Sequence, residues 1–123
     1  MPETIIHADE SGEYWSHEGC HILELVNQDS DPAVSIARAR VTPDTQTCWH
    51  YLEGVTERYL IAQGRGSVEV GESLVAQVKA GDIVLIPAGI RQRIRNTGSD
   101  DLVFYAICSP RFTASCYRSV RED

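Results

Sequence analysis

Three polar side chains, those of His50, Glu57 and Gln92, lie in short apolar segments where strand alternation would turn them toward an interior. An inward carboxylate such as Glu57 needs a metal, another cation or hydrogen bonds to offset its desolvation. Tyr59 shares the face of Glu57 and could act as a proton donor or pack as a ring with a satisfied hydroxyl. The opposite face of this segment carries Arg91, Arg93 and Arg95. Because three arginines cannot enter a core unpaired, we expect this face to contact water or a partner.

Short segments rich in Val, Ile, Leu and Tyr surround these positions and predict the elements that hold them. Glycine- and proline-containing turns separate the segments, as at Gly81-Asp82 and Pro87-Ala-Gly89. This pattern is typical of an antiparallel sandwich or barrel with little room for helix. Strands are expected near His21–Asn27, Val34–Val41, Thr47–Leu52, Glu57–Gln63, Ser67–Val70, Leu74–Lys79, Ile83–Ile86, Arg91–Asn96 and Leu102–Cys108.

The bulk properties narrow the kind of partner. A chain of 123 residues has room for one core, and its net charge of −7 argues against nucleic acid or an anionic membrane surface. A small-molecule ligand fits better. Neither a signal peptide nor a membrane-spanning apolar run is evident, so we expect a cytoplasmic protein. Without an export signal, we expect reduced thiols at Cys20, Cys48, Cys108 and Cys116.

The segment from Gly81 to Asn96 carries a specific motif. It resembles the second motif of the cupin family, G(X)5PXG(X)2H(X)3N, at every fixed position except the histidine, which is Gln92. The resemblance implies an all-β fold, the double-stranded β-helix or jelly-roll barrel, in which the strand after the Pro87-x-Gly89 turn directs one side chain into the barrel.

The first cupin motif, G(X)5HXH(X)3-4E(X)6G, is present in a reduced form. Glu57 and Gly64 match its second half. Counting back from Glu57 places His50 on the first histidine, Leu52 on the second and Asp44 on the leading glycine. An alternative register takes Cys48 and His50 as the histidine pair, but it requires a longer turn before Glu57, so we favour the first.

The resemblance also implies a site. Members of the family bind a divalent metal such as Mn, Fe, Ni or Zn through these motif positions, which here are His50, Glu57 and Gln92. Loss of two imidazoles weakens such a set and moves its preference toward harder ions. Cys48, on the predicted face of His50, could complete the shell and would instead favour Zn or Fe. No nucleotide-binding or other cofactor-binding fingerprint accompanies these residues.

Two hypotheses follow. In the first, a metal held in the barrel acts on a small oxygenated metabolite by dioxygenase, isomerase or lyase chemistry. In the second, a metal-free barrel binds a small molecule or serves as a structural partner, and its polar residues satisfy one another. We expect an N-terminal arm or edge strand over residues 1–20, the barrel over 21–118 and a tail over 119–123. A homodimer is expected from the family and from the need to cover edge strands.

Overall fold

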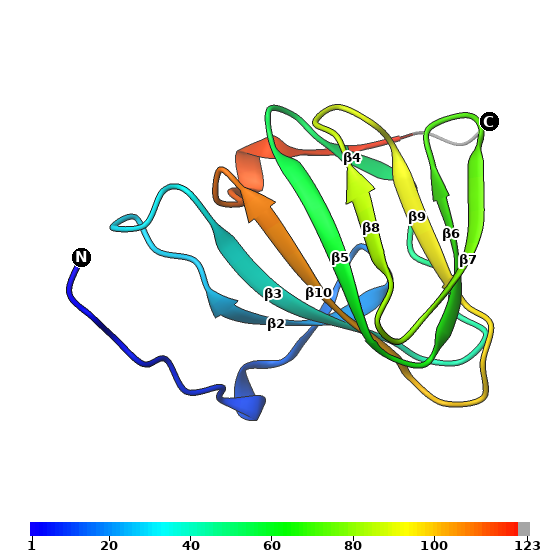
Figure 1. Ribbon diagram of the computed structural model, residues 1–123, viewed down its shortest axis with the longest axis horizontal. Coiled ribbons are helices and arrows are strands. Elements are labelled where there is room, and N and C mark those ends of the chain that lie inside the picture. Colours follow the sequence, from blue (N-terminus) through cyan, green and yellow to red (C-terminus); the bar gives the residue numbers. More distant parts are fainter. Residues whose placement is uncertain (121–123) are drawn as a thin grey trace.

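The computed structural model of the chain describes residues 1–120, and its regular secondary structure is almost entirely short strands (Figure 1). Two 3-10 helices, η1 (Glu10–Gly12) and η2 (Ala114–Cys116), accompany the strands. The strands are β1 (Tyr14–Ser16), β2 (Cys20–Val26), β3 (Ser35–Val41), β4 (His50–Leu52), β5 (Thr56–Gln63), β6 (Arg65–Val70), β7 (Leu74–Lys79), β8 (Ile83–Ile86), β9 (Gln92–Asn96), β10 (Leu102–Ser109) and β11 (Tyr117–Ser119).

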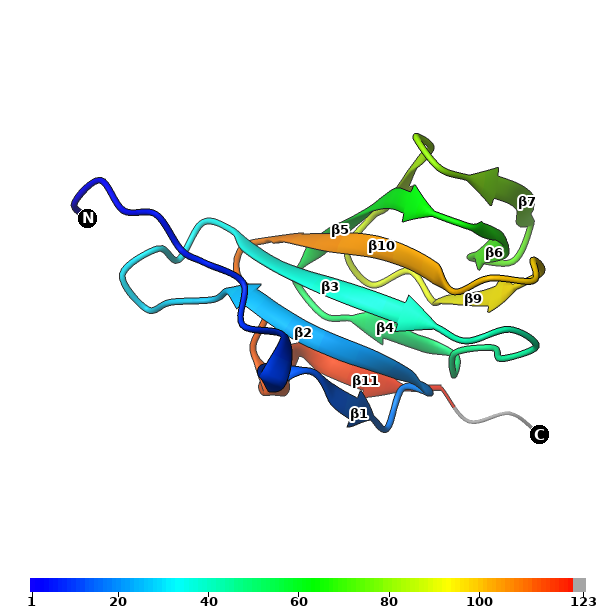
Figure 2. The ribbon, with the colours of Figure 1, turned by 90° about the horizontal axis from the view of Figure 1, so that it is seen from below.

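The strands form two antiparallel sheets. One sheet has the order β1-β2-β3-β10-β5-β8, and the other has the order β11-β4-β9-β6-β7. Figure 2 shows β2, β3 and β10 side by side in the first sheet, although β10 lies far from the other two in the sequence. The fold is a jelly-roll barrel, so the predicted fold class is confirmed.

Strand alternation separates inward-facing from outward-facing side chains as the sequence predicts. In β9, Gln92, Ile94 and Asn96 are all buried, whereas the arginines between and before them face outward. The guanidinium groups of Arg91 and Arg93 lie 4.4 and 4.3 Å from the ring centre of Trp49. The predicted arginine face is therefore on the outside of the five-stranded sheet, where it covers a tryptophan ring.

The segment before His50 differs from the prediction. A strand was expected from Thr47, but β4 begins only at His50. The Thr47 amide donates to Ile94 O (2.9 Å), and the Cys48 amide donates to Glu18 O (2.8 Å), so neighbouring residues bond in different directions. Regular alternation fails here, and Cys48 is exposed instead of sharing the buried face of His50.

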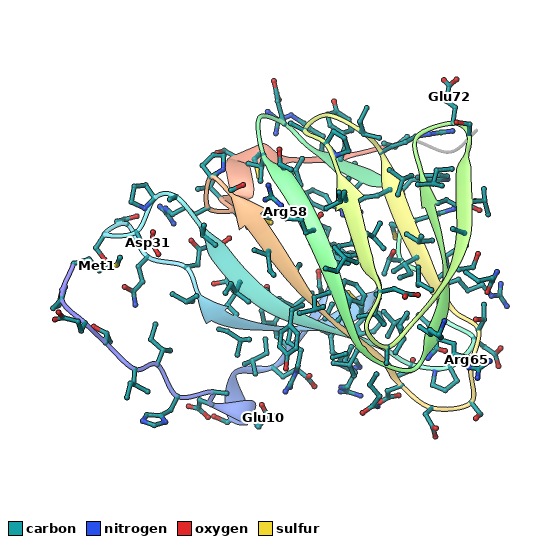
Figure 3. The ribbon with its side chains drawn as sticks, viewed as in Figure 1. Met1, Glu10, Asp31, Arg58, Arg65 and Glu72 are labelled. Carbon is teal, nitrogen blue, oxygen red and sulfur yellow. The ribbon has the colours of Figure 1, made fainter. Side chains whose placement is uncertain are left out.

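Both chain ends add a short strand, one within the segment expected as an N-terminal arm or edge strand and one after the last strand that was predicted. β1 pairs with β2 at the edge of the six-stranded sheet, within the expected N-terminal arm, and β11 pairs with β4. Glu10 lies in η1 of this arm (Figure 3). Arg38 of β3 donates to Glu10 Oε2 at 3.0 Å and ties the arm to the sheet. Most of the predicted tail 119–123 lies outside the described residues. Among residues 1–120, no helix is long and apolar enough to cross a membrane.

Candidate functional site

A buried hydrogen-bonded chain joins the two sheets. Glu57 and Tyr59 point inward from β5, and Gln92 points inward from β9 of the opposite sheet. Gln92 Nε2 donates to Glu57 Oε1 at 2.6 Å, and the Tyr59 hydroxyl donates to Gln92 Oε1. Both ends of the amide are therefore engaged, and Gln92 fixes the position of the carboxyl group.

Glu57 has an unusual electrostatic environment. Its side chain is 7% exposed, and desolvation raises its pKa from 4.5 to about 7, although the Gln92 hydrogen bond opposes the change. Its second oxygen, Oε2, is approached by the Cys108 thiol at 3.8 Å, a weak contact. One carboxyl oxygen thus accepts a short hydrogen bond, and the other accepts only a weak one.

That carboxyl lies at the wall of a cavity of about 410 Å³. Residues of β1, β2, β3, β5 and β10 line the cavity, together with residues of η2 and β11. Its volume lies in the range that suits a small metabolite. The lining residues are Tyr14, Ser16, His17, Glu18, Ile22, Glu24, Asn27, Ser35, Ile36, Ala37, Glu57, Ala106, Cys108, Phe112, Ala114 and Tyr117.

His50 also belongs to this region. It lies directly opposite Gln92 in the β4–β9 pair. Its Nδ1 is 2.9 Å from Cys48 O, and its ring stacks on Tyr117 with the ring centres 5.0 Å apart. His50 is therefore the register partner of Gln92, which in turn bonds Glu57, and the histidine ring contacts the cavity wall through Tyr117.

Several donor atoms of these three side chains take part in hydrogen bonds within the protein. The Gln92 amide oxygen accepts from Tyr59, Glu57 Oε1 accepts from Gln92, and His50 Nδ1 is bonded to the backbone. Nowhere in residues 1–120 do three or more His, Cys, Asp or Glu side chains gather as a metal centre would require. The metal set of His50, Glu57 and Gln92, with Cys48 as a possible addition, stays a prediction.

Two further motif positions have structural roles. Asn96 Nδ2 donates to Val41 O (2.9 Å) and to Asp100 O (2.8 Å), so this buried amide braces the barrel. Asp44, at the position of the first motif's leading glycine, has φ 62°. Aspartate tolerates this left-handed conformation better than most residues, which explains how the turn forms without glycine.

The sequence analysis missed much of the cavity wall. Tyr14, His17 and Glu18 come from the segment that was assigned as an arm or edge strand, and Tyr117 comes from the end of the chain. The signal available in the sequence was the mixture of aromatic and acidic residues near the N-terminus. Tyr59, the candidate catalytic residue, does not line the cavity and instead bonds Gln92.

Comparison with known families tests the resemblance to cupins that the two motifs carry. The Cupin domain family matches residues 37–108, from within β3 to near the end of β10. The chain belongs to the cupin family. Glu57 and Gln92, the core of the hydrogen-bonded chain, both fall inside the matched region of this cupin. No curated protein matches it.

Several solved structures share the fold of this cupin. A predicted oxalate decarboxylase from Thermotoga maritima is 23% identical, with a TM-score of 0.77 over 87% of this chain and 99% of that one. Streptomyces PAC13 with uridine is 17% identical, with a TM-score of 0.80 over 98% and 92%, and Pac13 is described as a nucleoside dehydratase. An uncharacterized Klebsiella pneumoniae protein with a double-stranded β-helix domain is 15% identical, with a TM-score of 0.78 over 98% and 100%. At these identities the likeness shows the fold alone.

Proposed function

We propose that this cupin is a metal-independent proton-transfer enzyme that binds a small molecule in the cavity, with Glu57 as the group that exchanges the proton. The observation that carries the proposal is the position of Glu57. Its Oε1 accepts a hydrogen bond from Gln92, its Oε2 has only the weak contact with the Cys108 thiol, and the residue lines the cavity. A carboxyl with a pKa near 7 can both accept and donate a proton at neutral pH.

Tyr59 and Gln92 act in this proposal as positioning residues. The Tyr59 hydroxyl orients the Gln92 amide, and the amide orients Glu57. Glu57 removes a proton from the bound molecule or returns one to it, and isomerase or lyase chemistry requires such steps. A nucleoside dehydratase with the same fold makes a lyase reaction reasonable for this barrel, although fold likeness by itself does not assign it.

Solvent deuterium exchange tests the proposal whatever the overall reaction is, because any reversible proton transfer from carbon to Glu57 exposes that proton to solvent. Small molecules that raise the melting temperature of the protein would be incubated with it in D2O and followed by NMR. We expect the wild type to introduce deuterium into at least one such ligand and the Glu57→Gln variant to lose this activity. Glutamine can still accept the Gln92 hydrogen bond, so the barrel should remain folded.

Glu53→Gln is the matched control, because Glu53 is exposed and pairs with Arg118 away from the lining of the cavity. It should leave the exchange unchanged. Exchange that persists in Glu57→Gln would overturn the assignment of Glu57. Ligand binding with no exchange by the wild type would favour the non-catalytic hypothesis, and exchange that depends on a stoichiometric metal would favour the metal-dependent one.

A further inference from the structure

The charged side chains that line the cavity are all acidic. Glu18 lies between β1 and β2, Glu24 lies on β2, and Glu57 lies on β5. No lysine or arginine from the described part of the chain lines the cavity. Glu57 is buried, Glu18 is partly buried and Glu24 is exposed, and as lining residues of one cavity they give it a negative potential.

The cations nearest in the fold are engaged elsewhere. Arg38 and Arg40 belong to β3, but they bond Glu13 at 3.3 and 2.6 Å on the other side of the sheet from Ala37. Arg111 donates to the lining residue Asn27 at 2.8 Å and is also paired with Asp29. Within residues 1–120, no lysine or arginine forms an ion pair with Glu18, Glu24 or Glu57.

The acidic residues of the cavity also raise the pKa of two tyrosine hydroxyls in its wall. Besides burial, the nearby charges of Glu24 and Glu18 raise the pKa of Tyr14. Burial and then Glu18 raise the pKa of Tyr117 to about 12. Both hydroxyls therefore stay protonated at neutral pH, and they present neutral rings to the cavity.

Aromatic and aliphatic side chains complete the wall. The rings of Tyr14, Phe112 and Tyr117 line the cavity together with Ile22 and Ile36. The faces of aromatic rings attract cations, and carboxylates bind ammonium groups through charge-assisted hydrogen bonds. A ligand with one ammonium group and an apolar body would satisfy both parts of the wall.

We propose that the ligand of this cavity is a small organic amine in its cationic form, with its ammonium group among Glu18, Glu24 and Glu57. The proposal rests on the proposed function in that both use the same cavity. An amine ligand would also distinguish this cupin from its structural neighbour from Thermotoga maritima, which is described as a predicted oxalate decarboxylase. A dicarboxylate would meet three carboxyl groups here and no cation.

Three probes of similar shape test the charge preference. Phenethylamine, 2-phenylethanol and 3-phenylpropanoate present a cation, a neutral group and an anion on the same aromatic body. Isothermal titration calorimetry at pH 8 and low salt should show phenethylamine binding about tenfold or more tighter than the alcohol. The carboxylate should bind most weakly. Equal affinities, tighter binding of the anion, or no binding of phenethylamine would overturn the proposal.

Variants of the acidic residues test whether the cavity wall causes the preference for a cation. Glu18→Gln combined with Glu24→Gln should reduce the preference for the cation at least about tenfold, whereas Glu53→Gln should leave it unchanged. An unaltered preference in the double variant would overturn the assignment of these carboxylates. Glu57→Gln separates the two proposals, since it should abolish deuterium exchange yet retain part of the preference for the cation. Deuterium exchange by a protein that does not prefer the cation would overturn only the proposal of an amine ligand. A preference for the cation without exchange that depends on Glu57 would overturn only the proposal of proton transfer.

Discussion

Removal of the ionisable group at Glu57 should change how the stability of the folded protein depends on pH. The carboxyl is buried, and its desolvation outweighs the hydrogen bond from Gln92, so the folded structure favours the protonated form. In Glu57→Gln the same position carries a permanently neutral group of almost the same shape. The two proteins should therefore differ little in stability at pH 5 and diverge as the pH rises.

The magnitude follows from the two pKa values of this carboxyl. Burial raises the pKa of Glu57 to about 7 in the folded protein, whereas the ordinary value is 4.5. The contribution is fully present below pH 4.5 and is lost as the pH rises through about 7, because the folded state retains the proton longer than the unfolded state. Each unit of pKa difference corresponds to about 1.4 kcal/mol, so we expect the free energy of unfolding to fall by about 2–3 kcal/mol between pH 5 and pH 8.

Urea unfolding at pH 5, 6, 7 and 8 measures this change, with the fluorescence of the buried Trp49 as the signal. The difference in the free energy of unfolding between the wild type and Glu57→Gln isolates the contribution of this carboxyl from those of all other titrating groups. Glu53→Gln, at an exposed site, should follow the pH profile of the wild type. Parallel curves for wild type and Glu57→Gln would refute the reasoning, since they would mean that Glu57 titrates alike in both states.

Three further predictions concern the metal, a backbone contact and assembly. Protein purified without added metal should contain no stoichiometric metal by elemental analysis; metal that is present in the wild type and lost in His50→Ala would restore the metal-dependent hypothesis. Gly64→Ala should destabilise the fold by about 3 kcal/mol or more in urea unfolding, because φ is +85° and the added Cβ would lie 2.7 Å from Asp101 O. Gly54→Ala, with φ +73° and open space around it, should cost only about 1 kcal/mol, so equal losses would contradict the steric account. The homodimer expected from the family stays a prediction. Leu85, 67% exposed on the edge strand β8, marks an apolar site for such a contact, and sedimentation should show a dimer that Leu85→Glu weakens; a wild-type monomer at micromolar concentration would refute it.

Much of the barrel could be predicted from local patterns. Alternation in the segment Arg91–Asn96 assigned Gln92 to the interior and the arginines to the outside, because a strand has only two faces. The turn residues and the two motifs predicted the cupin fold over the region that the family matches. The pattern failed before His50, where the bonds of Thr47 and Cys48 to different segments interrupt the strand.

The sequence by itself determined that His50, Glu57 and Gln92 occupy related positions of one barrel, since motif spacing and alternation are properties of neighbouring residues. Only the tertiary structure decided what these side chains do there. The bonds from Gln92 to Glu57 and Tyr59 depend on which strands of the two sheets face each other. The acidic cavity likewise combines Tyr14 and Glu18 with Tyr117, from opposite ends of the chain. Such contacts arise from long-range packing, which short-range periodicity does not encode.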